Sequence, residues 1–480
     1  MRLELTNRLV ITDVTPKFRA WLTALLTMPN PQLAKLSRLG IYARRLPRVI
    51  KGYSAINANT VAMPRGVLTS ILQQARVMGE PITALEDKRD CAPKIRLVFG
   101  AELTAEQTRA VAQLQRVPFS VLAAPTGSGK TVMALAMAGQ RSMPFLVLVH
   151  TKELLYQWVE RIAQFLGLPP EAVGVIGDGQ CRVGQAATVA LVQSLYRKAT
   201  QPKVGFLIVD ECHRCPSRTF ADVVAQFSCS YMLGLSATPY RSDGLTPLIQ
   251  WYLGPVMAEL SRQTLEDSGA VLAAQVICKD TPFTTTSRLP VPKVFQALGG
   301  EPDADTTSYA TLLNELTMDP RRQACIANDV VAVANKRTGA CLVLSDRKAH
   351  CRALHQAIVD AGVKSVLLLG DMPRAARDEA VLAIRQNTAR VLVATGQLIG
   401  EGFDCAGLST LFLTTPVKFT GRLLQYIGRI LRPGPDKGQP LIYDYVDIQV
   451  PVFARAFRER KREYKRLGWK VQEVRGTNEC

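Results

Sequence analysis

A glycine-rich run near residue 127 has the residue types that bind a chain of phosphates. The run Ala124–Thr131 reads Ala-Pro-Thr-Gly-Ser-Gly-Lys-Thr; it follows the apolar run Ser120–Ala123 and precedes a helical pattern at Val132–Ala138. This strand–loop–helix context is the one that a phosphate-binding P-loop requires. Its glycines let backbone N–H groups turn toward phosphate oxygens, and the start of the helix adds positive charge. The run therefore predicts a nucleoside triphosphate site.

The side chains of this loop have separate expected roles. Lys130 would reach the β- and γ-phosphates of ATP, and the Thr131 hydroxyl would bind Mg²⁺. The general fingerprint begins with glycine where this chain has Ala124. The ATP contacts predicted within the loop are Pro125, Thr126, Gly127, Ser128, Gly129, Lys130 and Thr131.

Two adjacent carboxylates follow a second apolar run. Phe206–Val209 is apolar, and Asp210 and Glu211 come directly after it. Parallel α/β sheets bind ligands at the carboxyl ends of their strands. We expect Asp210 to hold Mg²⁺ through water, together with Thr131, and Glu211 to orient and deprotonate the water that attacks the γ-phosphate. Joined to the loop, the acidic pair predicts ATP hydrolysis.

Short apolar runs alternate with helical segments in two series, which predicts parallel sheets covered on both faces. The expected strands of the first series are Ser120–Ala123, Phe145–Val149, Thr188–Val192, Phe206–Val209 and Tyr231–Leu235. Those of the second are Ala340–Leu344, Ser365–Leu369, Arg390–Ala394, Thr410–Leu413 and Leu441–Tyr443. The predicted fold class is α/β, with two tandem lobes. We place the seam between them near Leu253–Pro255, so that the lobes cover residues 97–256 and 257–450.

The two ends of the chain lie outside these series. Residues 1–96 are expected to form a small α+β module with a strand at Leu3–Ile11 and a helix at Arg65–Met78. Residues 451–480 are expected to form a basic helical tail, with the helix at Val452–Leu467 ended by Gly468. The module also holds a basic stretch with aromatic residues, which fits a solvated face and a DNA contact equally well. Its residues are Tyr42, Arg44, Arg45, Arg48, Lys51 and Tyr53.

The net charge of +19 is concentrated at these ends. Residues 1–100 carry 16 Lys and Arg against 6 Asp and Glu, a balance of +10, and residues 451–480 carry 9 against 4, a balance of +5. Because each phosphate that Lys or Arg neutralises releases condensed counterions, two basic ends favour a polyanionic partner. A soluble basic surface is the alternative.

Other features limit the compartment and the metal chemistry. No apolar run is long enough to span a bilayer, and no secretory leader is recognisable, so we expect a cytoplasmic protein without a membrane partner. The eleven scattered cysteines are typical of reduced thiols. Cys212, His213 and Cys215 resemble half of a zinc site, but no second pair of ligands follows at a suitable spacing. A zinc site is therefore not expected.

On these motifs the sequence resembles the superfamily 2 helicases of the DEAD/DEAH (DExH) kind over residues 97–475. The Ala124 form of the loop is the variant that those proteins use, and Asp210–His213 resembles their second motif. The resemblance implies two RecA-like lobes and ATP with Mg²⁺ as cofactors. It also implies that the following residues couple hydrolysis to movement: His213 and, in the third motif, Ser236, Ala237 and Thr238.

Further motifs resemble those of the second helicase lobe. Ala394–Gly396 and Glu401–Asp404 are similar to the fifth motif, which implies ATP contacts at Gly402 and Asp404. Gln425–Arg432 is similar to the sixth, in which Gln425, Arg429 and Arg432 would act in catalysis. A guanidinium group from the facing lobe stabilises the charge that develops on the γ-phosphoryl group. The implied catalytic set is Lys130, Asp210, Glu211, Gln425, Arg429 and Arg432.

The resemblance also places the base and the nucleic acid. Gln107 would contact the adenine, although Thr104, Ala105 and Glu106 precede it where the family has an Arg and a Tyr, so base discrimination would be looser. Contacts to a nucleic-acid backbone carry no sequence information. The residues implied for these contacts are Thr151, Lys152, Gln193, Ser194, Arg347 and Thr395.

The run Leu233–Arg241, together with Asp210–His213, narrows the resemblance to the branch of XPB-like repair helicases, phage recombination helicases and restriction motors. The end of the chain resembles bacterial and phage members of that branch, at Val446–Asp447, Val450–Pro451 and Tyr464–Gly468. Members act mainly on DNA, and many translocate 3′ to 5′. We expect an ATP-dependent DNA helicase for single-stranded, forked or branched DNA, with a nuclease or a repair or recombination protein as a possible partner. The alternatives are a duplex translocase or restriction-type motor subunit, an RNA helicase, and a non-catalytic nucleic-acid clamp.

Overall fold

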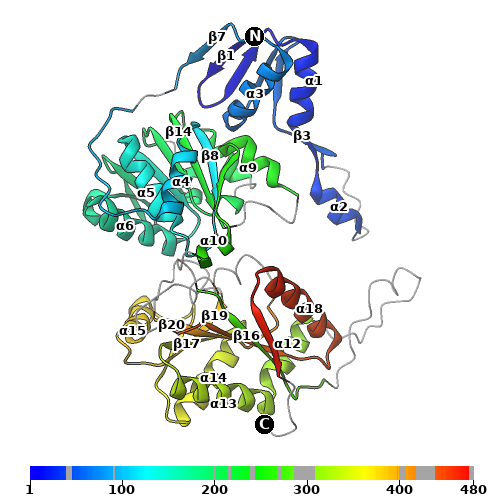
Figure 1. Cartoon of the computed structure of the whole chain (residues 1–480), viewed down its shortest axis with the longest axis vertical. Coiled ribbons are helices and arrows are strands. Elements are labelled where there is room, and N and C mark those ends of the chain that lie inside the picture. Colours follow the sequence, from blue (N-terminus) through cyan, green and yellow to red (C-terminus); the bar gives the residue numbers. More distant parts are fainter. Residues whose placement is uncertain are drawn as a thin grey trace. The chain divides into compact units, whose positions relative to one another are not determined.

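The computed structural model describes residues 1–38, 46–89, 92–197, 201–214, 218–237, 244–267, 272–285, 309–396, 398, 407–417, 427 and 438–474. The chain divides into two compact units, Met1–Ser261 and Arg262–Cys480. Figure 1 labels the helices and strands of both.

The first unit begins with a small mixed module. Its five-stranded sheet has the order β5-β6-β2-β1-β7 and is formed by β1 (Arg2–Leu5), β2 (Leu9–Thr12), β5 (Ser54–Asn57), β6 (Thr60–Met63) and β7 (Ala84–Asp87). Helices α1 (Pro16–Leu25) and α3 (Leu68–Met78) lie beside this sheet (Figure 1). The module also contains a two-stranded sheet of β3 (Thr27–Pro29) and β4 (Val49–Lys51), the helix α2 (Pro31–Arg38) and the 3-10 turn η1 (Arg65–Val67).

The single strand expected at Leu3–Ile11 is a hairpin instead. The chain turns back after β1, so that Leu3 pairs with Ile11 and Leu5 with Leu9 in the antiparallel ladder. All four side chains are buried, because alternate residues of both strands point to the same face. The alternation is the same for one strand and for two, which is why the pattern alone missed the turn.

An eight-stranded sheet forms the rest of the first unit, in the order β11-β10-β12-β9-β13-β14-β8-β15. All of its pairs are parallel except β10 with β11. Its strands are β8 (Phe119–Ala123), β9 (Phe145–Val149), β10 (Gly174–Gly177), β11 (Gln180–Arg182), β12 (Ala187–Leu191), β13 (Phe206–Val209), β14 (Tyr231–Ser236) and β15 (Val256–Glu259). Its helices are α4 (Ala105–Leu114), α5 (Lys130–Arg141), α6 (Lys152–Leu166), α7 (Val192–Tyr196), α8 (Arg218–Val224), α9 (Thr246–Leu253), η2 (Pro170–Ala172) and η3 (Cys212–Arg214).

Both faces of this sheet are covered, and its strands are apolar throughout for that reason. Along β9, Phe145 and Val147 pack with residues of α4, α5 and α6, whereas Leu146 and Leu148 pack with residues of α8 and α9. The second of these clusters continues into the core of the N-terminal module, where it includes Phe18.

Buried contacts join the module to the sheet. Arg65 is 2% exposed, and its guanidinium donates to the backbone oxygens of Thr6 (3.2 Å) and Cys229 (2.8 Å) and to the Cys229 thiol (3.1 Å). Beside it, a Cβ atom on Gly66 would lie 2.6 Å from both the Trp251 oxygen and the Gly254 nitrogen, so only glycine fits. The module is therefore part of the first compact unit.

The second unit contains a seven-stranded, wholly parallel sheet of the order β18-β19-β17-β20-β21-β16-β22. Helices α13 and α14 pack with one apolar cluster of this sheet, and α15 and α18 with the other. The strands are β16 (Gln275–Asp280), β17 (Ala340–Ser345), β18 (Ser365–Leu368), β19 (Val391–Thr395), β20 (Leu408–Leu413), β21 (Leu441–Val446) and β22 (Lys470–Val474). The helices are α10 (Arg262–Asp267), α12 (Tyr309–Met318), α13 (Pro320–Lys336), α14 (Lys348–Asp360), α15 (Arg374–Arg385) and α18 (Pro451–Arg466).

Three expected boundaries differ from those observed. The seam lies at residue 261 rather than 256, because β15 pairs with β8 and completes the first sheet. The described residues of the expected tail, 451–474, belong to the second lobe: α18 packs on the second sheet, and β22 pairs with β16 as its edge strand. Residues 1–96 are not a separate compact unit. In each case strand pairing or buried side chains join segments that composition had separated.

Candidate nucleotide-binding site

The carboxyl ends of three neighbouring strands bring the predicted nucleotide motifs together. Strand β14 lies between β8 and β13, and all three are parallel. The glycine-rich loop follows β8, the acidic pair follows β13, and Ser236 ends β14. Motifs that are far apart in the sequence therefore meet at one edge of the first sheet.

The loop after β8 has the backbone of a phosphate cradle. Gly127 and Gly129 have φ values of +92° and +83°, which glycine adopts without steric cost. Gly129 caps helix α5, whose first residue is Lys130. The Ser128 hydroxyl is buried and has no hydrogen-bond partner among the residues that the structure describes. Because a buried polar group without a partner is unfavourable, this hydroxyl suits a ligand oxygen in the loop.

Lys130 lies over this loop. Its Nζ donates to the backbone oxygens of Ala124 (2.9 Å) and Pro125 (3.2 Å). These neutral carbonyl groups hold the amine at the loop, where its charge also acts on Asp210 and Glu211. Lys130 is therefore placed to meet an anion there.

The acidic pair has a defined geometry. Asp210 accepts a hydrogen bond from the Trp158 indole on α6 (Nε1 to Oδ2, 2.8 Å) and another from the backbone N–H of Glu211 (2.9 Å). Glu211 has a φ of +48°, a region that residues other than glycine rarely adopt. Backbone strain of this kind is common at functional sites. This turn lets the two neighbouring carboxylates meet different partners: Asp210 contacts the Trp158 indole, and Glu211 contacts the His213 ring.

His213 connects this acidic pair to the end of β14. Its Nδ1 lies 3.2 Å from Glu211 Oε2 and 3.0 Å from the buried Ser236 hydroxyl. One imidazole ring therefore connects Glu211 to Ser236 of the third motif. Ala237 follows at the end of the strand, and Thr238 lies outside the described residues.

The surroundings of the two carboxylates shift their pKa values in opposite directions. Burial, and then the charge of Glu211, raise the pKa of Asp210. Burial also acts to raise the pKa of Glu211, but the hydrogen bond with His213 and the charges of Lys130, His213 and His150 outweigh it and lower that pKa to about 2. Glu211 is accordingly a carboxylate at neutral pH.

Gln107 lies next to the phosphate loop. Its Nε2 donates to the backbone oxygen of Ser128 (3.0 Å), and its Oε1 accepts from the backbone N–H of Thr104 (3.0 Å) as part of a capping box at the start of α4. This glutamine is therefore close to the loop, as a base-contacting residue must be, and its role with adenine stays a prediction.

Four predicted nucleic-acid contacts lie at the same edge of the first sheet. Thr151 follows β9 and caps α6, with its hydroxyl accepting from the Leu154 N–H (3.3 Å). Lys152 forms an ion pair with Asp178. Gln193 and Ser194 lie on α7, directly after β12. The structure thus places these residues at one sheet edge, and their contact with nucleic acid stays a prediction.

Two further predicted contacts belong to the second unit. Thr395 ends β19 and pairs with Ser345 at the end of β17, and Arg347 follows β17 as the cap of α14. Arg347 donates to Asn314 Oδ1 on α12 (2.8 Å). Both residues therefore lie at the carboxyl ends of neighbouring parallel strands. The other predicted residues of this unit, Gly402, Asp404, Gln425, Arg429 and Arg432, lie outside the described residues.

Trp158 is a site residue that the sequence did not reveal. Its side chain is 2% exposed, and on an amphipathic helix a tryptophan reads as an ordinary core residue. The indole N–H of a buried tryptophan needs a partner, and here that partner is Asp210. Only the three-dimensional contact between α6 and the end of β13 identifies it.

Two family descriptions match the chain. Residues 100–241 match "Type III restriction enzyme, res subunit", and residues 323–434 match "Helicase conserved C-terminal domain". The first match contains the loop, the acidic pair and Ser236, and the second contains Gln425, Arg429 and Arg432.

Curated relatives carry helicase or translocase names. A putative ATP-dependent RNA helicase of Acanthamoeba polyphaga mimivirus is 24% identical over 73% of this chain and 64% of its own length. The DNA 3′-5′ translocase XPB2 of Sulfurisphaera tokodaii is 34% identical over 34% of this chain and 37% of its own length. A probable helicase of Escherichia phage T5 is 25% identical over 72% and 71%. The chain thus matches just under two thirds of the first of these relatives and about a third of the second.

Solved structures share the fold. A fragment of a putative HsdR subunit of a type I restriction enzyme from Vibrio vulnificus superposes with a TM-score of 0.56 and 18% identity, over 78% of this chain and 69% of that one. The likeness confirms the expected fold, with two parallel-sheet lobes. No helix in the described part of the chain is long and apolar enough to cross a membrane.

Proposed function

Because this chain belongs to superfamily 2 of the ATP-dependent helicases, in the branch of XPB-like, phage recombination and restriction-motor proteins, we propose that it hydrolyses ATP to move along DNA. One observation carries the proposal. The loop with Lys130 and the acidic pair with Glu211 meet at one sheet edge, and His213 connects that pair to Ser236.

The residues at this edge fit ATP and Mg²⁺. The loop offers the Lys130 amine, the buried Ser128 hydroxyl and the glycine backbone to phosphate oxygens. Thr131, on the first turn of α5, and Asp210 supply the hard oxygen ligands that Mg²⁺ prefers. When bound, the metal would neutralise charge on the phosphates.

The side chains at this edge would have separate roles in ATP hydrolysis. Lys130 binds the β- and γ-phosphates, and Glu211, a carboxylate at neutral pH, orients the attacking water and accepts its proton. His213 contacts both Glu211 and Ser236, so it would transmit a change in the position or charge of Glu211 to Ser236. From the sequence we further propose that Arg429 and Arg432 stabilise the γ-phosphoryl group, and that Gln425 supports them.

Replacing Trp158 with phenylalanine tests the support of the acidic pair. The change keeps the ring in the core and removes the hydrogen bond to Asp210. Because groups that orient a metal ligand are typically worth 10- to 100-fold in metal affinity, we expect about a 10-fold higher Mg²⁺ concentration for half-maximal hydrolysis. A Mg²⁺ titration of the ATPase rate measures this. An unchanged Mg²⁺ requirement in a folded variant would contradict the role given to Trp158.

The N-terminal module offers a second surface for the nucleic acid. A hollow of about 290 Å³ lies between the module and the first sheet's helices, and its lining includes Arg8, Lys51, Tyr53 and Tyr252. Cations suit a phosphate backbone, and aromatic rings suit bases. We propose that DNA ahead of the motor lies against this hollow.

Charge reversal tests that surface. In Arg8→Glu with Lys51→Glu, we expect the DNA concentration for half-maximal stimulation of the ATPase to rise about 10-fold. The slope of the logarithm of DNA affinity against the logarithm of salt concentration should become less steep by about one for each lost phosphate contact. The rate without DNA should stay the same. Lys17→Glu with Arg76→Glu makes the same charge change elsewhere on the module and is the control. Equal effects of the two pairs would show that only net charge matters.

The names of the relatives include both an RNA helicase and a DNA translocase, so the nucleic acid and the type of movement need a direct test. We propose DNA, with 3′ to 5′ movement. The assay compares strand separation on forked DNA and on matched RNA with displacement of a third strand from duplex DNA. Separation of a DNA fork with a 3′ tail supports the helicase proposal. Third-strand displacement alone indicates a duplex translocase, and separation of RNA alone indicates an RNA helicase.

A further inference from the structure

The four residues that follow β20 are held by three helices and by the turn after β17 in the second unit. Arg322 on α13 donates to the Thr414 oxygen (2.8 Å), and the backbone N–H of Asp346 donates to the Thr415 hydroxyl (3.2 Å). The Tyr309 hydroxyl on α12 donates to the Pro416 oxygen (3.3 Å), and Arg460 on α18 donates to the Val417 oxygen (3.0 Å). We call residues 414–417 the held segment.

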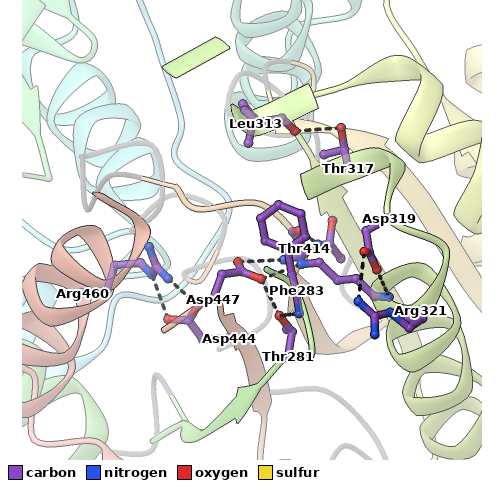
Figure 2. A network of polar contacts seen from close by, with 11 residues as sticks. Thr281, Phe283, Leu313, Thr317, Asp319, Arg321, Thr414, Asp444, Asp447 and Arg460 are labelled. Atoms are coloured by element: carbon purple, nitrogen blue, oxygen red, sulfur yellow. Dashed lines mark hydrogen bonds and ion pairs between the residues drawn. The ribbon is translucent and has the colours of Figure 1, made fainter. Parts of the chain in front are cut away.

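The two arginines are themselves fixed by buried aspartates. Asp447 accepts from Arg322 at 2.8 and 3.2 Å and from the Thr281 hydroxyl at 2.6 Å. Asp444, the fourth residue of β21, accepts from Arg460 twice at 2.8 Å. Figure 2 shows both aspartates with the bonds to Arg460 and Thr281. All four charged side chains are at most 2% exposed.

Arg322 and Arg460 make contacts beyond their ion pairs. A buried ion pair is weak evidence for stability, because desolvation offsets its attraction. Each guanidinium here pairs with its aspartate and also bonds a carbonyl of the held segment, and its planar fork supports both contacts. Their common target is the backbone of residues 414–417.

The chain continues from this segment into residues 418–437, which carry Gln425, Arg429 and Arg432. Ile427, two residues before Arg429, is fully buried in the apolar cluster that also contains Leu411 and Leu413 of β20. Residues 414–417 and Ile427 are therefore both held in the second unit, and Arg429 and Arg432 follow Ile427 by two and five positions in the sequence.

We propose, on the basis of the proposed function, that Arg322 and Arg460 are positioning residues for ATP hydrolysis. They fix the start of the segment that carries Arg429 and Arg432. Helix α18 contributes to catalysis in this way, through a buried face that bears Arg460 and Tyr464, and the latter donates to Asp444 (3.0 Å).

The test removes the pair without leaving a buried charge. In Arg460→Met with Asp444→Asn, the Tyr464 hydrogen bond can persist, whereas the bond to Val417 is lost. Because small displacements of catalytic groups can cost about 100-fold, we expect the kcat of ATP hydrolysis to fall 10- to 100-fold, with a KM for ATP that changes less than about threefold. Arg321→Met, an exposed arginine beside Arg322, is the control and should leave both constants unchanged.

A double-mutant cycle separates positioning from a general loss of structure. In an Arg429→Ala background, the pair of substitutions should lower kcat less than about threefold further, because both act on the same step. Full additivity, or a KM change as large as the kcat change, would overturn the proposal. If the pair does not fold, Arg460→Lys keeps the charge opposite Asp444 but lacks the fork, and the same loss of kcat is expected.

These outcomes are distinct from failure of the proposed function. If the wild-type chain does not hydrolyse ATP, that function is wrong. If the wild type hydrolyses ATP and the folded pair variant keeps the wild-type kcat, only the positioning role of Arg460 is wrong.

Discussion

Substitution of Lys130 by alanine is expected to lower the rate of ATP hydrolysis at least about 100-fold, because one aligned charge at a reacting phosphate is worth that much or more. The amine lies over the loop at the carboxyl end of β8, where it contacts two backbone oxygens. Without it, the loop keeps its glycine backbone but loses its positive side chain. Binding of ATP should therefore weaken together with hydrolysis.

Steady-state hydrolysis with saturating DNA, and the binding of a fluorescent ATP analogue, measure the two losses. Lys203→Ala removes an exposed lysine from the same unit and is the control, for which no change is expected. Thermal unfolding should show that both variants fold. Hydrolysis at the wild-type rate by a folded Lys130→Ala protein would show that this loop is not the nucleotide site.

Substitution of Glu211 by glutamine is expected to separate binding from chemistry. Glutamine has the same shape but accepts a proton poorly, and a general base typically contributes between 10²- and 10⁴-fold. We therefore expect kcat to fall by about that factor while ATP still binds. The hydrogen bonds of Lys130 to the backbone oxygens of Ala124 and Pro125 can persist in this variant.

Rapid-mixing measurements of ATP binding and of phosphate release distinguish these effects. Glu171→Gln, at an exposed position of the same unit, is the matched control. Equal losses in affinity and in kcat would indicate that Glu211 holds the metal rather than the water. An unchanged kcat would remove Glu211 from the reaction.

The first lobe could be predicted from its sequence because its local signals agree with its fold. Phe145–Val149 and Phe206–Val209 are strands with the expected bounds, since both faces of a covered parallel sheet require continuous apolar runs. The positions of the glycine-rich loop and of the acidic pair, at the ends of β8 and β13, could be predicted for the same reason: each follows such a run.

Contacts between distant segments could not be predicted. Residues 470–474 read as part of a polar tail, yet they form the edge strand beside β16, because pairing supplies what their composition does not. Arg65 and Arg460 contribute to the positive charge that the sequence places at the two ends of the chain. Both side chains are in fact buried and hydrogen-bonded. Trp158 read as core, and its hydrogen bond to Asp210 depends on a helix that begins only after β9. In each case tertiary partners decide the role of the residue.

We propose that nucleotide hydrolysis at the sheet edge with Lys130 and Glu211 is coupled to movement on nucleic acid. The measurement that tests it most directly is the rate of ATP hydrolysis by the wild-type chain with Mg²⁺, with and without single-stranded DNA. We predict a low rate that rises several-fold with DNA and depends on Mg²⁺. A chain that hydrolyses no ATP, or whose rate ignores DNA and RNA alike, would contradict the claim.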